Sequence, residues 1–332
     1  MRATVERVRQ CSLIALACLL PGCVFVTGNL NPFTTTPHPL EEHVVSGTGG
    51  PKILLVDISQ TIASQPEDGT FGINRRESTT ARVREELEQA AKDDRVQAVV
   101  LRINSPGGTV TASDIVFHEI MSFKTDRHVP VVADLLDMGT SGAYYVALAA
   151  DEIVASPTTV TGSIGVVMYG VNFSGLMEKI GVKNQTLKTG AHKDIGSPLR
   201  KMTPEDKAIL HSVLNQMQER FVSLVRERRP TLDKAAAQTI TDGRIFTADQ
   251  ALQAGLVDKI GYLDDALRVA KGRAGITEAR VIMYRRPDEF AENVYSSQAA
   301  LHPLEMNLVN FDLGGMGHAS PQFMYMWLPN AE

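Results

Sequence analysis

Short apolar runs rich in β-branched residues alternate with amphipathic segments along the first half of the chain. The apolar runs cover residues 52–58, 96–103 and 129–136. Apolar residues recur at helical spacing in the two segments between them, 80–94 and 111–124. This alternation predicts an α/β fold of stacked βαβ units around a parallel sheet. A longer helix is expected over 203–229, with Thr203 as its N-cap and Pro204 as its first residue.

The composition fits a folded protein with an ordinary surface. Of the 332 residues, 43% are hydrophobic and 21% are charged, which is enough to form a full core. The 33 Lys and Arg residues against 38 Asp and Glu residues give a formal net charge of −5. Because no basic field is present, we do not expect the chain to bind nucleic acid.

The first 22 residues are expected to form a secretory signal of the lipoprotein type. Three arginines precede the apolar run CSLIALACLL at 11–20, which is shorter than the roughly 20 residues that span a bilayer. The following LPGC at 20–23 resembles a bacterial lipoprotein signal that is cleaved before Cys23, whose thiol is then acylated. The alternative is an uncleaved anchor that extends to Val26.

The position of the cysteines and the next segment agree with export. All three cysteines lie within the first 23 residues, so the cleaved chain cannot form an internal disulfide. Residues 23–50 are rich in Thr, Pro and Gly and predict a flexible tether. We therefore expect a folded domain over 51–272 at a membrane of the cell envelope, on the extracytoplasmic side, which is the periplasm in a Gram-negative cell. Residues 273–332 form an extension for which the sequence predicts no structure.

Two turns with small residues follow neighbouring strands of the predicted sheet. In SPGG at 105–108, Gly107 and Gly108 permit backbone conformations that let an N–H group face a bound oxyanion, and the sequence does not decide which of the two does so. The alternative is a tight turn that only leads into the next helix. In TSGA at 140–143, Ser141 is either the cap of a helix or a nucleophile. Because parallel strands end at the same edge of a sheet, the two turns predict one site.

A nucleophilic serine needs a base that takes its proton. The nearest candidates after Ser141 lie in TLKTGAHKDIGSP at 186–198, and they are Lys188, His192 and Lys193. The residue types alone do not choose among these three side chains.

The chain resembles the signal peptide peptidase A type of serine peptidase, which uses a Ser–Lys dyad. The resemblance covers about residues 52–272, and an ordered set of motifs is more specific than any one of them. The motifs are RINSPGG (102–108), TSGAYYVALAAD (140–151), SPTTVTGSIGV (156–166), GAHKDIGSP (190–198) and DGRIFTADQALQAGLVDKIG (242–261).

The resemblance implies a role for each site residue. Ser141 is the nucleophile and Lys193 is the general base. The backbone N–H groups of Gly108 and Gly142 hold the oxyanion, and Ser163 orients the lysine. The resemblance implies no metal and no cofactor. An unperturbed lysine pKa of about 10.4 leaves only roughly one side chain in 2,500 neutral at pH 7, and a general base must be neutral. The site must therefore lower the pKa of its lysine, which burial away from water can do.

The resemblance also implies a Clp protease and crotonase-like fold, and a homo-oligomeric ring in which neighbouring subunits complete the active sites. The implied substrates are remnant signal peptides and other extended apolar peptides at the membrane. Many relatives have two glycines after the serine, whereas here Gly142 is followed by Ala143, which is also small. Two other functions remain open on such a fold. One is an acyl-CoA enzyme in which Ser141 is not a covalent nucleophile, and the other is an inactive scaffold that binds membrane peptides.

Overall fold

A computed structural model describes most of the chain after the predicted signal. The described residues are 38–66, 77–230, 232, 237–287, 289, 293–295 and 323–327. All of them except His38 belong to one compact unit, Pro39–Glu332. The predicted signal at 1–22 and the predicted lipidation site, Cys23, lie outside the described residues. No helix in the described part is long and apolar enough to cross a membrane.

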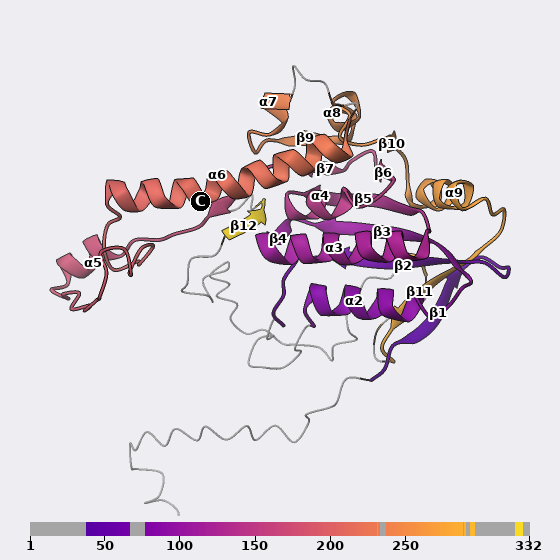
Figure 1. The fold of residues 1–332 in the computed structure, drawn as a ribbon, viewed down its shortest axis with the longest axis horizontal. Coiled ribbons are helices and arrows are strands. Elements are labelled where there is room, and N and C mark those ends of the chain that lie inside the picture. Colours follow the sequence, from indigo (N-terminus) through magenta and orange to yellow (C-terminus); the bar gives the residue numbers. More distant parts are fainter. Residues whose placement is uncertain are drawn as a thin grey trace, which may run out of the picture. The chain divides into compact units, whose positions relative to one another are not determined.

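A largely parallel sheet forms the centre of this unit (Figure 1). Within the described residues it has nine strands. Its main path runs through β1 (Glu41–Ser46), β11 (Arg280–Arg285), β2 (Lys52–Ser59), β3 (Val96–Ser105), β5 (Val131–Thr140), β6 (Glu152–Ala155) and β10 (Lys259–Ile260). Beside β5, β7 (Val160–Gly162) continues the sheet and pairs in turn with β9 (Ile245–Thr247). Only the β1–β11 and β7–β9 pairs of this sheet are antiparallel.

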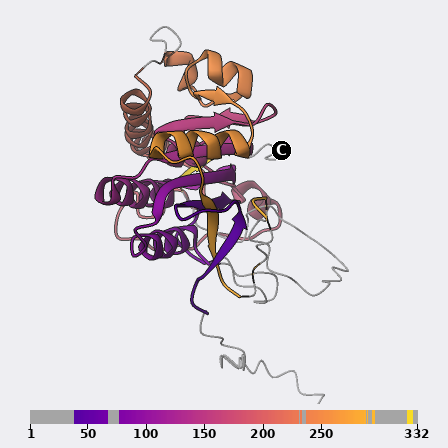
Figure 2. The same ribbon diagram turned by 90° about the vertical axis from the view of Figure 1, so that its right-hand side faces the viewer.

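Helices cover both faces of the sheet because its central strands are apolar on both sides (Figure 2). Leu54 and Val56 of β2 pack into one apolar cluster, whereas Ile53 and Leu55 pack into another. The first cluster includes residues of α2 (Thr79–Ala90), α3 (Val110–Arg127) and α4 (Gly142–Ala147), and the second includes residues of α9 (Leu263–Ala274). The parallel order β2–β3–β5, with α2 and α3 as crossovers, confirms the predicted α/β fold of stacked βαβ units.

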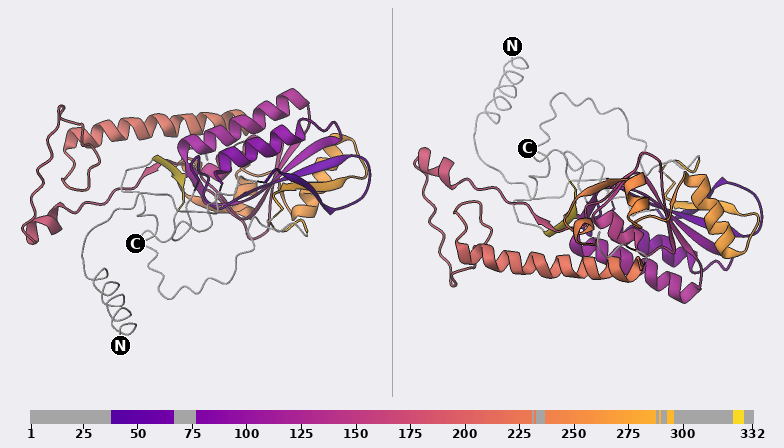
Figure 3. Two further views of the ribbon diagram at one scale, coloured as in Figure 1. Left: turned by 90° about the horizontal axis from the view of Figure 1, so that it is seen from below. Right: turned by 90° about the horizontal axis from the view of Figure 1, so that it is seen from above.

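A long segment projects from this body (Figures 1 and 3). It follows β8 (Val167–Met168) and contains α5 (Ser174–Lys179), a loop, and the first half of α6 (Pro204–Arg228). We call residues 169–216 the arm. The predicted cap of α6 is confirmed, because the Asp206 N–H donates to Thr203 Oγ1 at 3.0 Å. The other half of α6 returns to the body and is followed by α7 (Ala237–Ile240) and α8 (Ala248–Gln253).

The domain limits predicted from the sequence are wrong at both ends. Residues 41–46 lie within the predicted tether, but they form β1, which pairs with the edge of β11. Residues 280–285, placed in the extension, form β11 within the main sheet. The same extension holds β12 (Phe323–Met326), which lies between β4 (Gly107–Thr109) and β8 in a second, three-stranded sheet of the described chain.

Candidate active site

Ser141 occupies a strained turn between β5 and α4. Its φ of +54° and ψ of −116° lie in a region that residues other than glycine rarely adopt. The turn is fixed from both sides, since the Ser141 N–H donates to Gly162 O at 2.7 Å and Ser141 O accepts from the Tyr145 N–H at 2.9 Å. A sharp strand-to-helix turn of this kind can present a serine hydroxyl at the end of a sheet.

The hydroxyl of Ser141 is buried and unpaired. The residue is 1% exposed, and its Oγ has no hydrogen-bond partner among the described residues. It does not accept a bond from the first turn of α4, so the interpretation of Ser141 as a side-chain helix cap is wrong. The backbone conformation explains this, because the positive φ of Ser141 differs from the extended backbone of a capping residue.

The glycine turn lies next to Ser141, as the order of the strands predicts. β3 and β5 are parallel neighbours whose register brings Ser105 opposite Gly139. Gly107 has a φ of +103°, its N–H donates to Ser105 Oγ at 3.1 Å, and its carbonyl accepts from the Ile62 N–H at 2.8 Å. The N–H of Gly107 is therefore already occupied.

The N–H of Gly108 faces β12 instead. The register of β4 and β12 pairs Gly108 with Tyr325. Two residues away from this pair on each chain segment, the Trp327 N–H donates to Pro106 O at 3.0 Å. Since hydrogen-bonded pairs alternate along an antiparallel ladder, Gly108 and Tyr325 also form such a pair. The N–H of Gly108 consequently points at the carbonyl oxygen of Tyr325.

The backbone of Gly142 lies next to the same carbonyl oxygen, that of Tyr325. A Cβ atom on Gly107 would lie 2.1 Å from Tyr325 O and 2.8 Å from Gly142 N. One on Gly142 would lie 3.0 Å from Tyr325 O and 3.1 Å from Gly108 N. The Tyr325 oxygen thus lies close to the backbone of Gly142 and Gly108, whose N–H groups the resemblance implies as oxyanion donors. Only residues without a side chain leave room for an oxygen there.

Ser163 lies beside Ser141 at this end of the sheet. β5 and β7 are parallel, and Thr140 is paired with Gly162, so the next residues of the two strands are Ser141 and Ser163. Ser163 also has a positive φ, +51°, and its N–H donates to Arg244 O at 2.7 Å. Its hydroxyl forms no hydrogen bond within the described part of the chain. The structure therefore brings Ser163 to the site, while its role stays a prediction.

The structure of one chain does not bring Lys193 to Ser141. Lys193 is exposed, in the loop of the arm that precedes α6. The adjacent His192 holds this loop at the start of α6, because its Nδ1 lies 2.8 Å from Asp206 Oδ1. The site contacts α6 near Met217, about 17 Å further along at a rise of 1.5 Å per residue. Lys193 is therefore at the distant end of the arm.

Ion pairs fix the loop that carries Lys193. Arg200 contacts Asp206 Oδ2 at 2.5 Å and Asp194 Oδ1 at 2.7 Å. Hydrogen bonds from the Arg200 guanidinium are the main reason why the pKa values of Asp194 and Asp206 lie well below their usual range. Lys188, one of the alternative bases, is tied to Asp194 at 2.7 Å. The side chain of Lys193 has no such partner in the described structure.

A cluster of three aromatic rings, those of Tyr145, Phe221 and Tyr325, lies beside the site and was not predicted. The ring of Tyr325 stacks on Tyr145 with centroids 5.4 Å apart and lies 4.8 Å from the Phe221 ring. The Tyr325 hydroxyl donates to Met217 O at 2.8 Å, and burial raises the pKa of Tyr325 to about 12. Tyr145 is anchored in turn by a 2.6 Å hydrogen bond to Asp114. The only signal in the sequence was the pair of tyrosines after Ser141, which is equally typical of an ordinary core.

A buried carboxyl group lies in β5, the strand that leads to Ser141. Asp134 of β5 is fully buried, and neither carboxyl oxygen has a hydrogen-bond partner in the described residues. Burial raises the pKa of Asp134 to about 7, and the charge of Arg102 on the neighbouring strand opposes this shift. Asp134 is therefore a candidate for pH-dependent stability.

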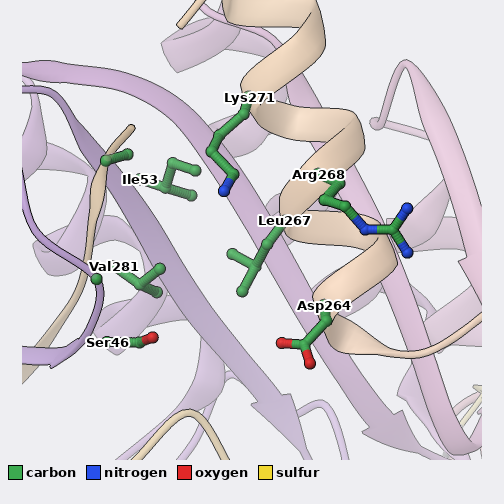
Figure 4. Close-up of a pocket in the computed structure, with 9 residues that line it drawn as sticks. Ser46, Ile53, Asp264, Leu267, Arg268, Lys271 and Val281 are labelled. Carbon is green, nitrogen blue, oxygen red and sulfur yellow. The ribbon is translucent and has the colours of Figure 1, made fainter. Parts of the chain in front are cut away.

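A surface cavity of about 230 Å³ lies away from Ser141 (Figure 4). It is formed by β1, β2, β11 and α9, and its lining includes Ile53, Asp264, Leu267, Arg268 and Lys271. Beside the glycine turn, β12 lies between β4 and β8. The described residues contain no cluster of three or more His, Cys, Asp or Glu that could hold a metal ion.

Comparisons with known proteins agree with the motifs. Residues 124–277 match peptidase family S49. Over 260 residues the chain is 34% identical to an Enterococcus faecium protein named as a signal peptide peptidase SppA, covering 78% of this chain and 74% of that relative. It is also 33% identical over 202 residues to protease 4 of Salmonella typhi, covering 60% of this chain and 32% of that protein.

Two solved structures are similar at low sequence identity. A mutant of the membrane-bound stomatin-specific protease 1510-N gives a TM-score of 0.43 at 15% identity, covering 71% of this chain and 98% of that one. A ClpP1 mutant from Listeria monocytogenes gives a TM-score of 0.42 at 18% identity, covering 64% of this chain and 94% of that one.

Proposed function

Because this chain belongs to the SppA-type serine peptidases of family S49, we propose that it is an endopeptidase whose Ser141 is activated by Lys193 of a neighbouring copy. One observation carries the proposal. The buried hydroxyl of Ser141 has no partner, sits on a strained turn, and lies beside the N–H groups of Gly108 and Gly142. This is a nucleophile and an oxyanion site that lack only a base.

The mechanism follows from these residue types. Ser141 Oγ attacks the carbonyl carbon of the scissile bond while the neutral amine of Lys193 takes the hydroxyl proton. The N–H groups of Gly108 and Gly142 hold the negative oxygen, and Ser163 orients the lysine. Lys193 then gives the proton to the leaving amine, and a water molecule hydrolyses the acyl-enzyme.

The surface of the arm supports assembly with a second copy. Large apolar side chains are exposed along it, including Leu187 at 97% and Ile180 at 65%. Others are Tyr169, Val171, Phe173, Leu176 and Val182. An exposed apolar surface of this kind typically marks an interface. Since Lys193 lies on the same arm, a copy that covers the arm would also exclude water from the amine, as a lysine base requires.

The cell envelope is the proposed location. The predicted signal and Cys23 lipidation would hold the enzyme at a membrane on the extracytoplasmic side, where a ring of copies would add to the affinity of each lipid anchor. We propose remnant signal peptides and other extended apolar segments as substrates. The name of the Enterococcus faecium relative supports this substrate class.

A fluorophosphonate probe tests the assignment of the nucleophile. We expect the purified protein to be labelled at Ser141, as mapped by peptide mass spectrometry. Ser141→Ala should abolish labelling, and Ser122→Ala, at an exposed serine of α3, should leave it unchanged. Absence of labelling together with tight binding of coenzyme A would favour the acyl-CoA enzyme. Absence of both would favour the inactive scaffold.

A further inference from the structure

The turn that carries Ser163 lies against a second loop, residues 241–244. The Ser163 N–H donates to Arg244 O at 2.7 Å, and a Cβ atom on Gly165 would lie 3.4 Å from the Cα of Gly243. Ser163 has a φ of +51°, which residues other than glycine rarely adopt, so the surrounding contacts must hold it in place. The position of the Ser163 hydroxyl therefore depends on how firmly the two loops are joined.

One side chain of α6 donates hydrogen bonds to both loops. The amide nitrogen of Gln218, Nε2, donates to Thr241 O at 2.8 Å and to Ile164 O at 3.2 Å. Ile164 is a fully buried residue and directly follows Ser163 in the chain. Removing the donor would leave a backbone carbonyl poorly satisfied next to Ser163, which is costly inside a protein. The two hydrogens of a single amide group thus join the two loops.

The helix that carries Gln218 is anchored to the body of the protein close to this residue. Arg220 Nη2 contacts Asp114 Oδ1 of α3 at 2.6 Å. Further along α6, Arg228 Nε donates to Leu148 O, directly after α4, at 2.8 Å. Gln218 therefore reaches the two loops from an element that is fixed relative to the helices beside the site, as precise positioning requires.

The hydroxyl of Ser163 can aim a lysine base at Ser141. A neutral amine carries one lone pair and two N–H groups, so a hydroxyl oxygen that accepts one N–H turns the lone pair toward another group. The Ser141 hydroxyl is the nearby candidate, because the Ser141 N–H donates to Gly162 O, one residue before Ser163, at 2.7 Å. We propose that Gln218 is a positioning residue, which fixes the Ser163 turn so that its hydroxyl orients Lys193. This inference rests on the function proposed above.

Gln218→Met tests the role of the amide, because methionine has a similar length and no N–H donor. With a fluorogenic apolar peptide as substrate, we expect kcat to fall about tenfold, as for the loss of one well-placed hydrogen bond, and KM to stay unchanged. Gln216→Met is the matched control, at an exposed glutamine of the same helix, and should leave both constants unchanged. Gln218→Lys keeps N–H donors on a flexible side chain and should recover most of the lost kcat.

A double-mutant cycle tests whether Gln218 acts through Ser163. If it does, Gln218→Met should lower kcat by no more than about twofold once Ser163→Ala has removed the hydroxyl. A further tenfold loss in the Ser163→Ala background would show that Gln218 affects the reaction by another route, which overturns the proposal. Thermal melting of each variant gives the temperature below which all of them are folded, and kcat is compared there.

The outcomes separate this inference from the proposed function. If Ser141→Ala removes peptide cleavage but Gln218→Met cleaves at the wild-type rate, the positioning role of Gln218 is wrong and the peptidase assignment stands. If Ser141→Ala still cleaves peptides, the peptidase mechanism itself is wrong.

Discussion

Two inactive variants should restore each other's activity if the dyad forms between copies. Ser141→Ala removes the nucleophile and Lys193→Ala removes the base, so either variant alone should not cleave peptides. In a mixed ring, a Lys193→Ala chain still offers its Ser141 to a neighbour that carries Lys193. Some sites in the mixture are therefore complete.

The size of the recovery follows from the geometry. The loop that carries Lys193 is held at the start of α6 by His192, about 17 Å along the helix from the contact with Tyr325. One chain therefore cannot supply both groups to one site without moving its arm. In rings of equal random composition, half of the sites have Ser141, and half of those face a chain with Lys193. We expect about one quarter of the wild-type activity per chain.

Co-expression of the two variants with different tags provides the assay. Peptide hydrolysis is measured on material that binds both tags, beside each variant alone and the wild type. Lys201→Ala in place of Lys193→Ala is the control, since Lys201 is an exposed lysine of the same loop. Activity of the mixture that does not exceed that of the separate variants would refute a dyad shared between copies.

Four further results are expected from single substitutions. Lys193→Arg should be inactive in peptide hydrolysis because arginine keeps its proton, whereas His192→Ala should retain most activity because His192 only fixes the loop against Asp206. Cys23→Ser should stop the incorporation of labelled palmitate in cells, and incorporation that persists would contradict lipidation at this residue. The raised pKa of Asp134, about 7, means that the folded state keeps a proton that the unfolded chain loses near its ordinary value of 3.8. The free energy of unfolding should therefore fall as the pH rises from 4 to 7, and Asp134→Asn should remove up to about 4 kcal/mol of this fall in urea titrations.

The parts of the fold that depend on local signals were predictable. The strands at β2, β3 and β5 follow from continuous apolar runs, which are typical of buried parallel strands. The start of α6 follows from Thr203, because its side chain accepts a hydrogen bond from the N–H of Asp206, only three residues further along the chain. The site at the ends of β3 and β5 follows from their order in the chain, because both turns leave the same edge of the sheet.

The remaining features depend on partners that are distant in the sequence or lie outside one chain. β1 and β12 are short and become strands only by pairing with β11 and with β4 and β8, respectively. A short strand of this kind has little intrinsic preference apart from its neighbours. The motif that contains Lys193 could be found from the sequence, but one chain does not bring Lys193 to Ser141, and the contact proposed here depends on a second copy, which no local pattern predicts.

The distance between Ser141 Oγ and the nearest Lys193 Nζ in the assembled protein tests the central claim most directly. A crystal or cryo-electron microscopy structure of the purified oligomer would provide it. We predict that the nearest Lys193 belongs to a neighbouring copy and lies within about 2.6–3.2 Å, the range in which a base can take the proton. A Lys193 that stays in solvent in every copy, with His192 or another group in contact with Ser141, would contradict the Ser–Lys dyad.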